Sequence, residues 1–503
     1  MSTVTARLCG NAVEMSVDGK LPFPHELRQP VEEQLSFKHV QVLRGMQKYD
    51  QYRAGLRRPT RVETRRLFAY DKYDRLVFGA GLLSRVERCL RDLGWSVSFI
   101  DVTPPHPRQD RFYEDWDNVV RNFNFRARQD ECLTKLASVD RGVIDAPTGF
   151  GKSFLYAAIG LLFPRAHIRI VTKRLDLVSG ARRHMMNYLP NIGQVGGGQN
   201  EIGRITIVSA DSLHKVDPDF CDILIGEEAH QLVAPAYAGR LAQFQRSRMY
   251  GFTATPTGRM DGTDKRLESL FGPVVFQMTY PEAVELGLVV PIRVRWIDTV
   301  EPGNPAEGMS DVPKLRHGIW RNEARNRRIA DEAHLYGDDD QVLIMVTTLE
   351  HALYLRQYLP EFTICHAGGK EDRRTEGFIK RGLATEEDFR MSAARRRALR
   401  EAFEKRELKK VIATDVWSTG VSFDSLSILI RADARGSTIM DTQIPGRVCR
   451  TDAATDKSEG LVIDMLDEFD RGFSAQARKR RRNYESKGWE QEFPLGYALR
   501  RRS

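Results

Sequence analysis

The stretch Asp145-Ala146-Pro147-Thr148-Gly149-Phe150-Gly151-Lys152-Ser153 determines the interpretation of the rest of the chain. It follows the apolar run 142–144 and precedes a longer apolar run, 154–162. A buried strand, a glycine-rich turn and a helix in this order are typical of a P-loop, whose backbone N–H groups bind phosphate at the positive end of the helix. The first glycine of the usual pattern is Ala146 here, and the alternative is an ordinary glycine-rich turn.

The P-loop reading gives individual side chains expected roles. Lys152 reaches the β- and γ-phosphates, and the Ser153 hydroxyl binds Mg²⁺. ATP and Mg²⁺ are therefore the expected cofactors. The nucleotide-binding residues expected in this turn are Thr148, Gly149, Phe150, Gly151, Lys152 and Ser153.

Composition limits the class of protein. The 503 residues are too many for one hydrophobic core, so about three domains are expected. With 41% hydrophobic and 29% charged residues, the chain reads as soluble and globular, and no apolar run has the length of a membrane span. A net charge of +9 suggests a polyanionic partner only in combination with motifs.

Six scattered cysteines and an N-terminus without a secretory signal indicate a reducing compartment. No C-x-x-C pair is present, which argues against a zinc site and against a disulfide framework. The expected location is the cytoplasm, that of a bacterial host if a phage encodes the protein. No membrane partner is expected.

Residues 1–115 contain no recognisable catalytic motif and are predicted to form a small α/β module. Short strands are predicted near 68–71 and 75–78, a helix over 82–90 and a strand over 95–100. The arginines that precede them either form a solvated surface or contact nucleic acid. They are Arg53, Arg57, Arg58, Arg61, Arg65 and Arg66.

From about residue 116 to 290, strands alternate with helices, as a parallel sheet with crossover helices requires. Residues 125–129 are predicted to open a helix upstream of the P-loop, and the amide of Gln129 can read an adenine edge with both its donor and its acceptor. Glu227 and Glu228 follow the predicted strand 222–226, whose residues 223–226 are apolar or glycine. Carboxylates at the end of a buried strand in a P-loop domain hold Mg²⁺ and orient water, although two acidic residues can also simply begin a helix.

A second α/β lobe is predicted over 291–465, without a second P-loop. It offers Arg447 and Arg450 instead, which suggests an ATP site completed by arginines from the other lobe. The alternative is an exposed helix face. The basic tail 466–503 contains Arg478 to Arg482, and is either a solvated helix face or a surface that follows phosphates.

In order and spacing, these motifs resemble the set that defines superfamily 2 helicases and translocases. The match runs from about residue 125 to 455 and includes Thr-Ala-Thr at 253–255 and Gln-x-x-Gly-Arg-x-x-Arg at 443–450. Within the superfamily the chain looks most like the bacteriophage UvsW-type branched-DNA helicases. The resemblance implies an α/β protein with two tandem RecA-like parallel-sheet lobes and a small N-terminal domain.

The resemblance also implies roles for single residues. Gln129 would contact adenine, with Arg126 nearby. Glu228 would polarise the attacking water, and Glu227 would hold Mg²⁺ through its coordination shell. The γ-phosphate would be sensed by Gln443, Arg447 and Arg450. Coupling between the ATP site and the lobe interface would involve His230, Thr253 and Thr255. The nucleic-acid backbone would be contacted by Thr172, Thr347 and Thr414.

Three departures from the family pattern stand out. The acidic box begins with Glu227, one methylene longer than the usual Asp, which would shift Mg²⁺ or slow turnover. The Asp that follows Gly-Val in the second lobe is Ser422 here. The segment 371–391 is longer than the minimal core requires.

The expected function is an ATP-dependent helicase or translocase on branched, forked or single-stranded DNA in recombination, repair or replication restart. One alternative is an RNA helicase, which has the same core. Another is a branched-DNA clamp with little ATP turnover, which Glu227 favours. A translocating restriction subunit would need a nuclease centre, and no convincing cluster of that kind lies outside the core.

Overall fold

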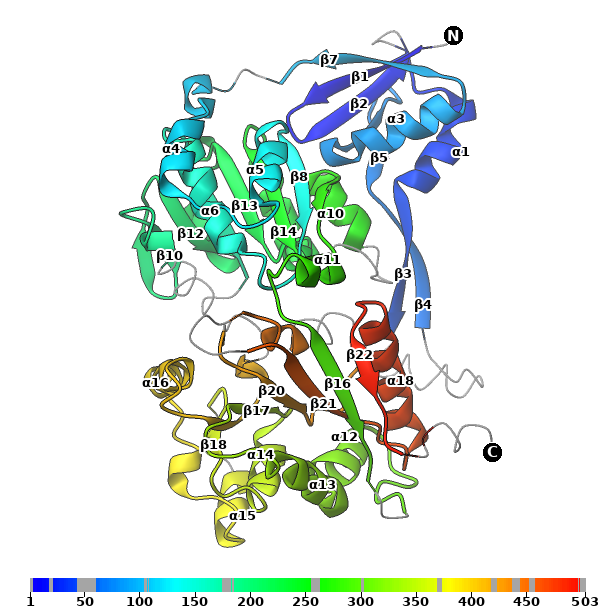
Figure 1. Ribbon diagram of the computed structural model, residues 1–503. Helices are drawn as coiled ribbons and strands as arrows, with labels where there is room; N and C mark the ends of the chain where they lie inside the picture. Colours follow the sequence, from blue (N-terminus) through cyan, green and yellow to red (C-terminus); the bar gives the residue numbers. More distant parts are fainter. Residues whose placement is uncertain are drawn as a thin grey trace. The chain divides into compact units, whose positions relative to one another are not determined.

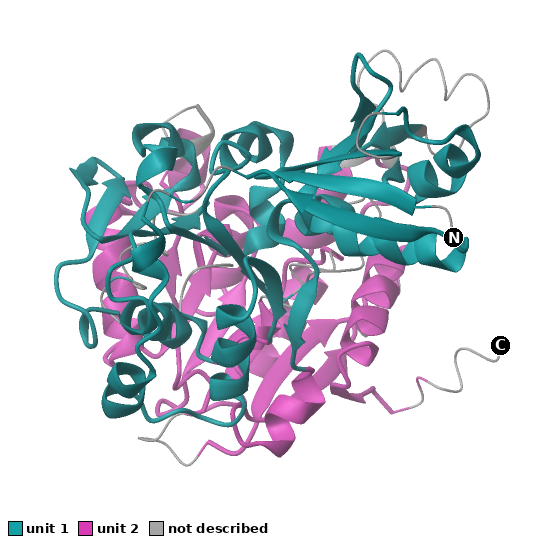
Figure 2. Ribbon diagram, turned by 90° about the horizontal axis from the view of Figure 1, so that it is seen from above, with its two compact units in different colours: residues 1–146, 151–278 teal, residues 147–150, 279–503 magenta. Residues whose placement is uncertain are grey.

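The protein is described by a computed structural model that divides into two compact units (Figure 2). The first unit contains residues 1–146 and 151–278, and the second contains 147–150 and 279–503. The described residues are 3–17, 21–42, 60–103, 106, 108–173, 182, 185–254, 263–299, 303–368, 373–417, 423–436, 444–451, 457–495 and 497.

The first unit begins with a small module built on a five-stranded sheet (Figure 1). Residues with alternating burial, such as Val13 and Met15, turn one face of the sheet toward the helices, whose Val31 and Val86 are buried in the same core. The strands, in order across the sheet, are β5 (Phe68–Tyr70), β6 (Leu76–Gly79), β2 (Ala12–Val17), β1 (Thr3–Cys9) and β7 (Ser96–Asp101). The covering helices are α1 (His25–Gln34) and α3 (Leu83–Asp92).

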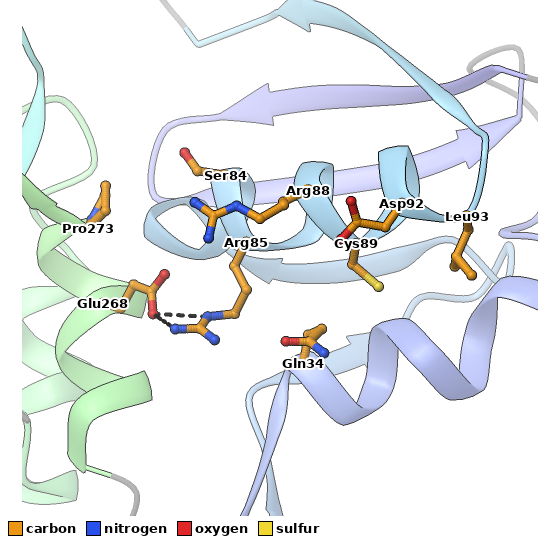
Figure 3. A pocket seen from close by; sticks show the side chains of 9 residues that line it. All are labelled: Gln34, Ser84, Arg85, Arg88, Cys89, Asp92, Leu93, Glu268 and Pro273. Atoms are coloured by element: carbon orange, nitrogen blue, oxygen red, sulfur yellow. Dashed lines mark hydrogen bonds and ion pairs between the residues drawn. The ribbon is translucent and has the colours of Figure 1, made fainter. Parts of the chain in front are cut away.

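The module is joined by close contacts to helix α10 (Thr263–Phe271) of the same unit. A Cβ at Gly79 would overlap Ser269, and one at Gly81 would overlap the backbone oxygen of Glu268, so glycine is required at both positions. Arg85 of α3 also forms an ion pair with Glu268 at 2.5 Å, beside a cavity of about 270 Å³ (Figure 3). The module and α10 therefore pack as one body.

A two-stranded antiparallel ribbon extends from the module (Figure 1). It consists of β3 (Ser36–Val42) and β4 (Thr60–Arg66), paired from Ser36 opposite Arg66 to Val42 opposite Thr60. Lys265 of α10 donates hydrogen bonds to the backbone oxygens of Glu33 and Ser36 at its base. Arg53, Arg57 and Arg58 lie outside the described residues, as does the side chain of Arg61.

The rest of the first unit is an eight-stranded sheet, parallel except for the β10–β11 pair. Its strands, in order, are β11 (Gln199–Glu201), β10 (Gly193–Gly196), β12 (Ile205–Ser209), β9 (Ile168–Thr172), β13 (Ile223–Glu227), β14 (Arg248–Thr253), β8 (Arg141–Asp145) and β15 (Val274–Gln277). The other helices of this unit are α4 (Trp116–Asn122), α5 (Gln129–Ala137), α6 (Lys152–Leu162), α8 (Ala229–Leu232) and α9 (Pro235–Leu241).

The second unit contains a seven-stranded sheet in which every strand pair is parallel. Its strands, in order, are β18 (Thr363–Cys365), β19 (Lys410–Ala413), β17 (Val342–Met345), β20 (Ile428–Arg431), β21 (Gly460–Met465), β16 (Ile292–Ile297) and β22 (Glu490–Glu492). Its helices are α11 (Tyr280–Glu285), α12 (Asp311–Leu315), α13 (Glu323–Ala333), α14 (Leu349–Arg356), α15 (Arg373–Lys380), α16 (Ala393–Glu404) and α18 (Arg471–Glu485). The prediction of two parallel-sheet lobes preceded by a small α/β domain is confirmed.

The basic C-terminal stretch contributes regular structure to the second unit. Residues 471–485 form α18, and β22 pairs with β16 at the edge of the sheet. The segment 371–391, expected as an insertion, contains α15, whose Phe378 is buried in the core of this unit. No helix in the described part of the chain is both long and apolar enough to cross a bilayer.

Candidate functional site

Three neighbouring strands of the first unit bring the predicted motifs to one edge of the sheet. Strand β14 lies between β8 and β13, and all three run parallel. The P-loop follows β8, Glu228 follows β13, and Thr253 ends β14. Because the carboxyl ends of parallel strands meet at the same edge, residues more than 100 positions apart in sequence come together there.

The P-loop has the backbone geometry of a phosphate cradle. Gly149 and Gly151 have φ values of 96° and 90°, which favour glycine, and α6 begins directly at Lys152. The Lys152 ammonium donates a hydrogen bond to the Ala146 oxygen at 3.3 Å. Ala146 is buried and has no positive φ, so alanine fits at the position where the family has glycine.

The remaining P-loop residues differ in their exposure to solvent. Phe150 is buried, whereas Thr148 and Ser153 are partly exposed. Partial exposure leaves these two hydroxyl side chains accessible from solvent, as the predicted contact of Ser153 with a metal ion requires.

Gln129, predicted to contact adenine, packs against the P-loop and is only 1% exposed. Its Oε1 accepts a hydrogen bond of 2.9 Å from the backbone N–H of Arg126, whose side chain is exposed. A Cβ at Gly151 would lie 2.6 Å from Gln129 Nε2, so this glycine also allows the amide to approach the loop. The structure thus links Gln129 to the P-loop by direct packing.

An aromatic cluster beside the P-loop was not predicted from sequence. Phe154, the residue after Ser153, lies edge-on to Phe123 at 4.5 Å, to Tyr188 at 5.6 Å and to Phe125 at 5.9 Å between ring centroids. Only the spacing Phe-x-Phe immediately before Arg126 could have indicated it. Such clusters stabilise their surroundings by area and by ring geometry, so this one supports the first turn of α6.

The acidic pair lies at the end of β13 in an unusual conformation. Glu228 has φ 48° and ψ 50°, a left-handed backbone that is strained for a residue with a side chain. Burial, and then the neighbouring carboxylate of Glu228, raises the pKa of Glu227 to about 7, although Lys152 opposes the shift. Glu227 Oε2 is buried and accepts no hydrogen bond from any described residue.

These residues fit a magnesium ion held together with nucleotide phosphates. A buried carboxylate oxygen without a hydrogen-bond donor is a suitable ligand for a hard cation, and Ser153 adds a hydroxyl next to the cradle. Within the described ranges no group of three or more His, Cys, Asp or Glu side chains could hold a metal ion. Magnesium usually needs only one or two carboxylates when substrate phosphates complete its shell.

We expect Glu227→Gln to stabilise the nucleotide-free protein in a pH-dependent way. Because the pKa of Glu227 is raised to about 7 from its ordinary 4.5, the folded state binds this proton more tightly than the unfolded state does. The stability that this proton contributes is lost as the pH rises through about 7. The advantage of the variant should therefore grow by on the order of 2 kcal/mol between about pH 5 and about pH 8.

Thermal unfolding of both proteins at the two pH values measures this effect. Glu201→Gln, at an exposed residue of the same unit, is the matched control. An equal advantage of Glu227→Gln at both pH values would contradict the elevated pKa.

The predicted coupling residues of the first unit are in contact. His230 is buried, and its Nδ1 lies 2.8 Å from Thr253 Oγ1 and 3.4 Å from Glu228 Oε2. The His230 imidazole therefore connects the Glu228 carboxylate to Thr253 at the end of β14. Thr255 lies outside the described residues.

The second unit holds the predicted arginine pair near its turn η8 (Pro445–Arg447). Arg447 is 4% exposed, whereas Arg450 Nη1 forms an ion pair of 3.0 Å with Asp424 Oδ1. Asp424 comes two residues after Ser422, which stands where the family has its acidic residue. Gln443 and Ser422 lie outside the described residues.

The three threonines predicted to contact nucleic acid lie at or just after strand ends. Thr172 ends β9 in the first unit, whereas Thr347 and Thr414 follow β17 and β19, which are neighbours in the second. The hydroxyl oxygens of Thr172 and Thr347 are buried and form no hydrogen bond with described residues. Thr347 and Thr414 are therefore brought to the same edge of one sheet.

Two family models match the chain. Residues 122–258 match the model for the res subunit of type III restriction enzymes, and residues 326–452 match the helicase conserved C-terminal domain. The first range contains the P-loop and Glu227, and the second contains Arg447 and Arg450. No curated protein matches the chain.

Solved structures with a similar fold include a putative HsdR subunit of a type I restriction enzyme from Vibrio vulnificus, with 16% identity, a TM-score of 0.53 and coverage of 76% of this chain and 72% of that one. Dbp5 of S. cerevisiae, bound to RNA and ADP BeF3, has 13% identity, a TM-score of 0.51 and coverage of 78% and 97%. T4 UvsW has 14% identity, a TM-score of 0.41 and coverage of 98% and 99%. At these identities the similarity concerns the fold alone, and the UvsW score is too low to support a conclusion.

Proposed function

The chain belongs to superfamily 2 of the helicases and translocases, and on that premise we propose that it is an ATP-driven motor on branched or forked DNA. The family is one of ATP-dependent, helicase-type enzymes. We further propose a role in recombination, repair or replication restart in the cytoplasm. The observation that carries the proposal is the meeting of the P-loop, the acidic pair and Thr253 at one sheet edge.

In the proposed cycle the P-loop N–H groups, Lys152 and Ser153 bind the phosphates of ATP with its Mg²⁺. The ion supplies charge neutralisation on the phosphate oxygens. Glu227 holds the ion and Glu228 orients and polarises the attacking water. Removal of the γ-phosphate then changes the contacts of Glu228 with His230, and through it of Thr253.

Arginines of the second unit complete the proposed cycle. We propose that Arg447 and Arg450 sense the γ-phosphate, and that Arg450 exchanges its ion pair with Asp424 for the phosphate. An exposed ion pair contributes about 1 kcal/mol or less, so a phosphate can displace the Asp424 carboxylate easily. Asp424 would thus hold Arg450 between cycles. It would supply the negative charge that the family has at the sequence position of Ser422.

We propose that contacts from Thr172, Thr347 and Thr414 follow the nucleic-acid backbone, so movement is largely independent of sequence. The main alternative is an RNA helicase, because Dbp5, which is similar in fold, is bound to RNA. Backbone contacts alone do not separate DNA from RNA, since the 2′-hydroxyl is the distinguishing group.

We expect forked DNA to stimulate ATP hydrolysis by the wild-type protein more than duplex DNA or single-stranded RNA does. The stimulation should weaken with salt, because binding to phosphates releases counterions. Initial rates on the three substrates at two salt concentrations measure this. The strongest stimulation by RNA would favour the RNA helicase, and binding of branched DNA without phosphate release would favour the clamp.

A further inference from the structure

Helix α18 has two faces of opposite character. Its buried residues Phe473, Ala477, Arg480 and Tyr484 recur every three or four positions and lie on one side. From its place in a basic run, Arg480 was expected to be either solvated or in contact with phosphate. It is buried instead. It anchors the helix to the sheet of the second unit.

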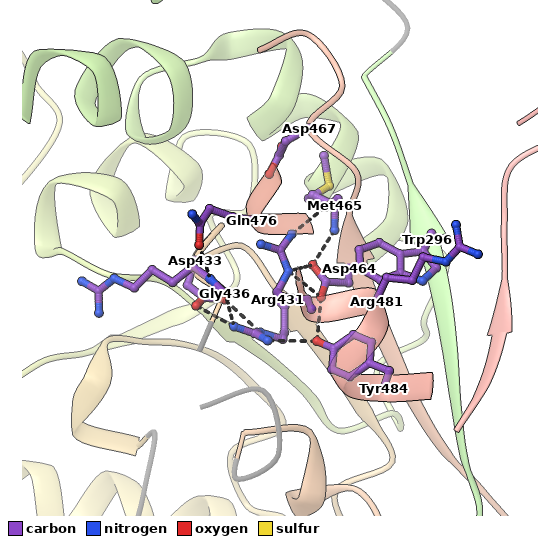
Figure 4. Close-up of polar contacts among 12 residues, drawn as sticks. Trp296, Arg431, Asp433, Gly436, Asp464, Met465, Asp467, Gln476, Arg481 and Tyr484 are labelled. Atoms are coloured by element: carbon purple, nitrogen blue, oxygen red, sulfur yellow. Dashed lines mark hydrogen bonds and ion pairs between the residues drawn. The ribbon is translucent and has the colours of Figure 1, made fainter. Parts of the chain in front are cut away.

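The anchor is a network of buried ion pairs (Figure 4). Arg480 Nε lies 3.0 Å from Asp464 Oδ2, and the Tyr484 hydroxyl donates a hydrogen bond of 2.7 Å to the same carboxylate. Arg431 pairs with Asp433 at 2.8 Å and donates a hydrogen bond to Tyr484. Because charges buried in this way need all their partners, the network holds α18 in a single orientation.

The opposite side of α18 carries a basic stripe, defined here as Arg471, Arg478, Lys479 and Arg482. All four are exposed. With 3.6 residues per turn they fall within an arc of about 100°, centred opposite the buried residues. None of the four forms an ion pair with another described residue, whereas Arg481, at the side of the helix, pairs with Glu485.

The stripe adjoins the end of strand β20. The backbone N–H of Gly436 donates a hydrogen bond of 3.2 Å to Gln476 Oε1, and a Cβ at Gly436 would lie 3.3 Å from the Cβ of Lys479. The preceding residue, Arg435, is exposed and pairs with Asp415 at 3.0 Å, directly after Thr414. A basic surface therefore runs from α18 to the sheet edge that carries Thr414.

We propose that the basic stripe of α18, continued by Arg435, binds the sugar-phosphate backbone of nucleic acid. This inference rests on the proposed function. From Arg471 to Arg482 the helix rises about 16 Å, the length of about five phosphates along one strand of B-form DNA. Like charges three or four positions apart on a helix repel one another, and a polyanion relieves that repulsion.

The test compares two triple variants with the same change in charge. The stripe variant is Arg478→Ala with Lys479→Ala and Arg482→Ala. The control variant is Lys380→Ala with Arg397→Ala and Lys405→Ala, at exposed residues of other helices and turns in the same unit. Binding of labelled single-stranded DNA, duplex DNA and single-stranded RNA is measured as a function of salt concentration, and melting temperatures check that both variants are folded.

For the stripe variant, we expect the slope of log affinity against log salt concentration to be smaller by about 2 to 3, with a loss of affinity of about tenfold or more at fixed salt. The control should keep the wild-type slope. Equal slopes for the two variants would overturn the inference while leaving the proposed function intact. If the wild-type protein bound none of the three probes and no forked DNA either, the proposed function itself would fail. A loss confined to RNA or to DNA would identify which backbone the stripe binds.

Discussion

Lys152→Ala should lower nucleic-acid-stimulated ATP hydrolysis by about a thousandfold. The lysine is the side chain whose positive charge lies in the phosphate cradle, at the first residue of α6. Its ammonium donates a hydrogen bond of 3.3 Å to the Ala146 oxygen, which orients the side chain toward the loop. Without it, charge that develops on the phosphate oxygens is stabilised only by backbone N–H groups, Mg²⁺ and the arginines.

Phosphate release in the presence of saturating forked DNA measures the effect. Lys152→Arg keeps the charge but not the shape, and should recover only part of the rate. Lys135→Ala, at a partly exposed lysine of α5 paired with Glu131, is a control for loss of a charge in the same unit. Undiminished turnover in Lys152→Ala would mean that ATP is not hydrolysed at this P-loop, and the motor proposal would have to be abandoned.

Glu228→Gln should lower the rate of ATP hydrolysis by about a thousandfold while ATP binding persists. The substitution preserves size and removes only the carboxylate that is proposed to polarise water. The strained backbone at Glu228, with φ 48°, indicates that the surrounding structure holds this residue in place. The phosphate cradle contains no atom of Glu228, so nucleotide affinity should change little.

Nucleotide affinity and phosphate release are measured on the same preparation. Retained hydrolysis in Glu228→Gln would reassign the catalytic carboxylate, and Glu227 would then be the candidate. The variant Glu227→Asp provides the comparison, since it restores the residue typical of the family. If the longer side chain shifts the ion, Glu227→Asp should turn over ATP faster than the wild-type protein does.

The residues of the candidate nucleotide site could be grouped from sequence because each of them lies in a local pattern. Lys152 and Glu228 each follow a short apolar run, and a parallel sheet brings such ends together whatever the distance between them along the chain. The aromatic cluster around Phe154 could not be predicted in the same way. Its members come from separate segments, and aromatic residues at such spacings are found in many hydrophobic cores.

Two other features depend on partners far away in sequence. Strand β1 pairs with β7, so Thr3 lies opposite Ser96, and no pattern near Thr3 indicates that partner. Arg480 lies within a run of basic residues that was expected to be either solvated or in contact with phosphate, whereas its buried partners, among them Asp464, distinguish it from its neighbours. Local patterns describe elements well, but they do not indicate which charge in a run is buried.

The junction at Gly79 and Gly81 limits how the role of the N-terminal module can be studied. Truncating the chain before α4 would remove the residues that pack against α10, the first described element after β14 and Thr253, and would therefore disturb the unit that contains the candidate nucleotide site. A loss of unwinding activity in such a fragment would therefore not show whether the missing module or the disturbed α10 is the cause. Conversely, because Gly79 and Gly81 bring the module into close contact with α10, we expect a partner that displaces the module to displace α10 as well.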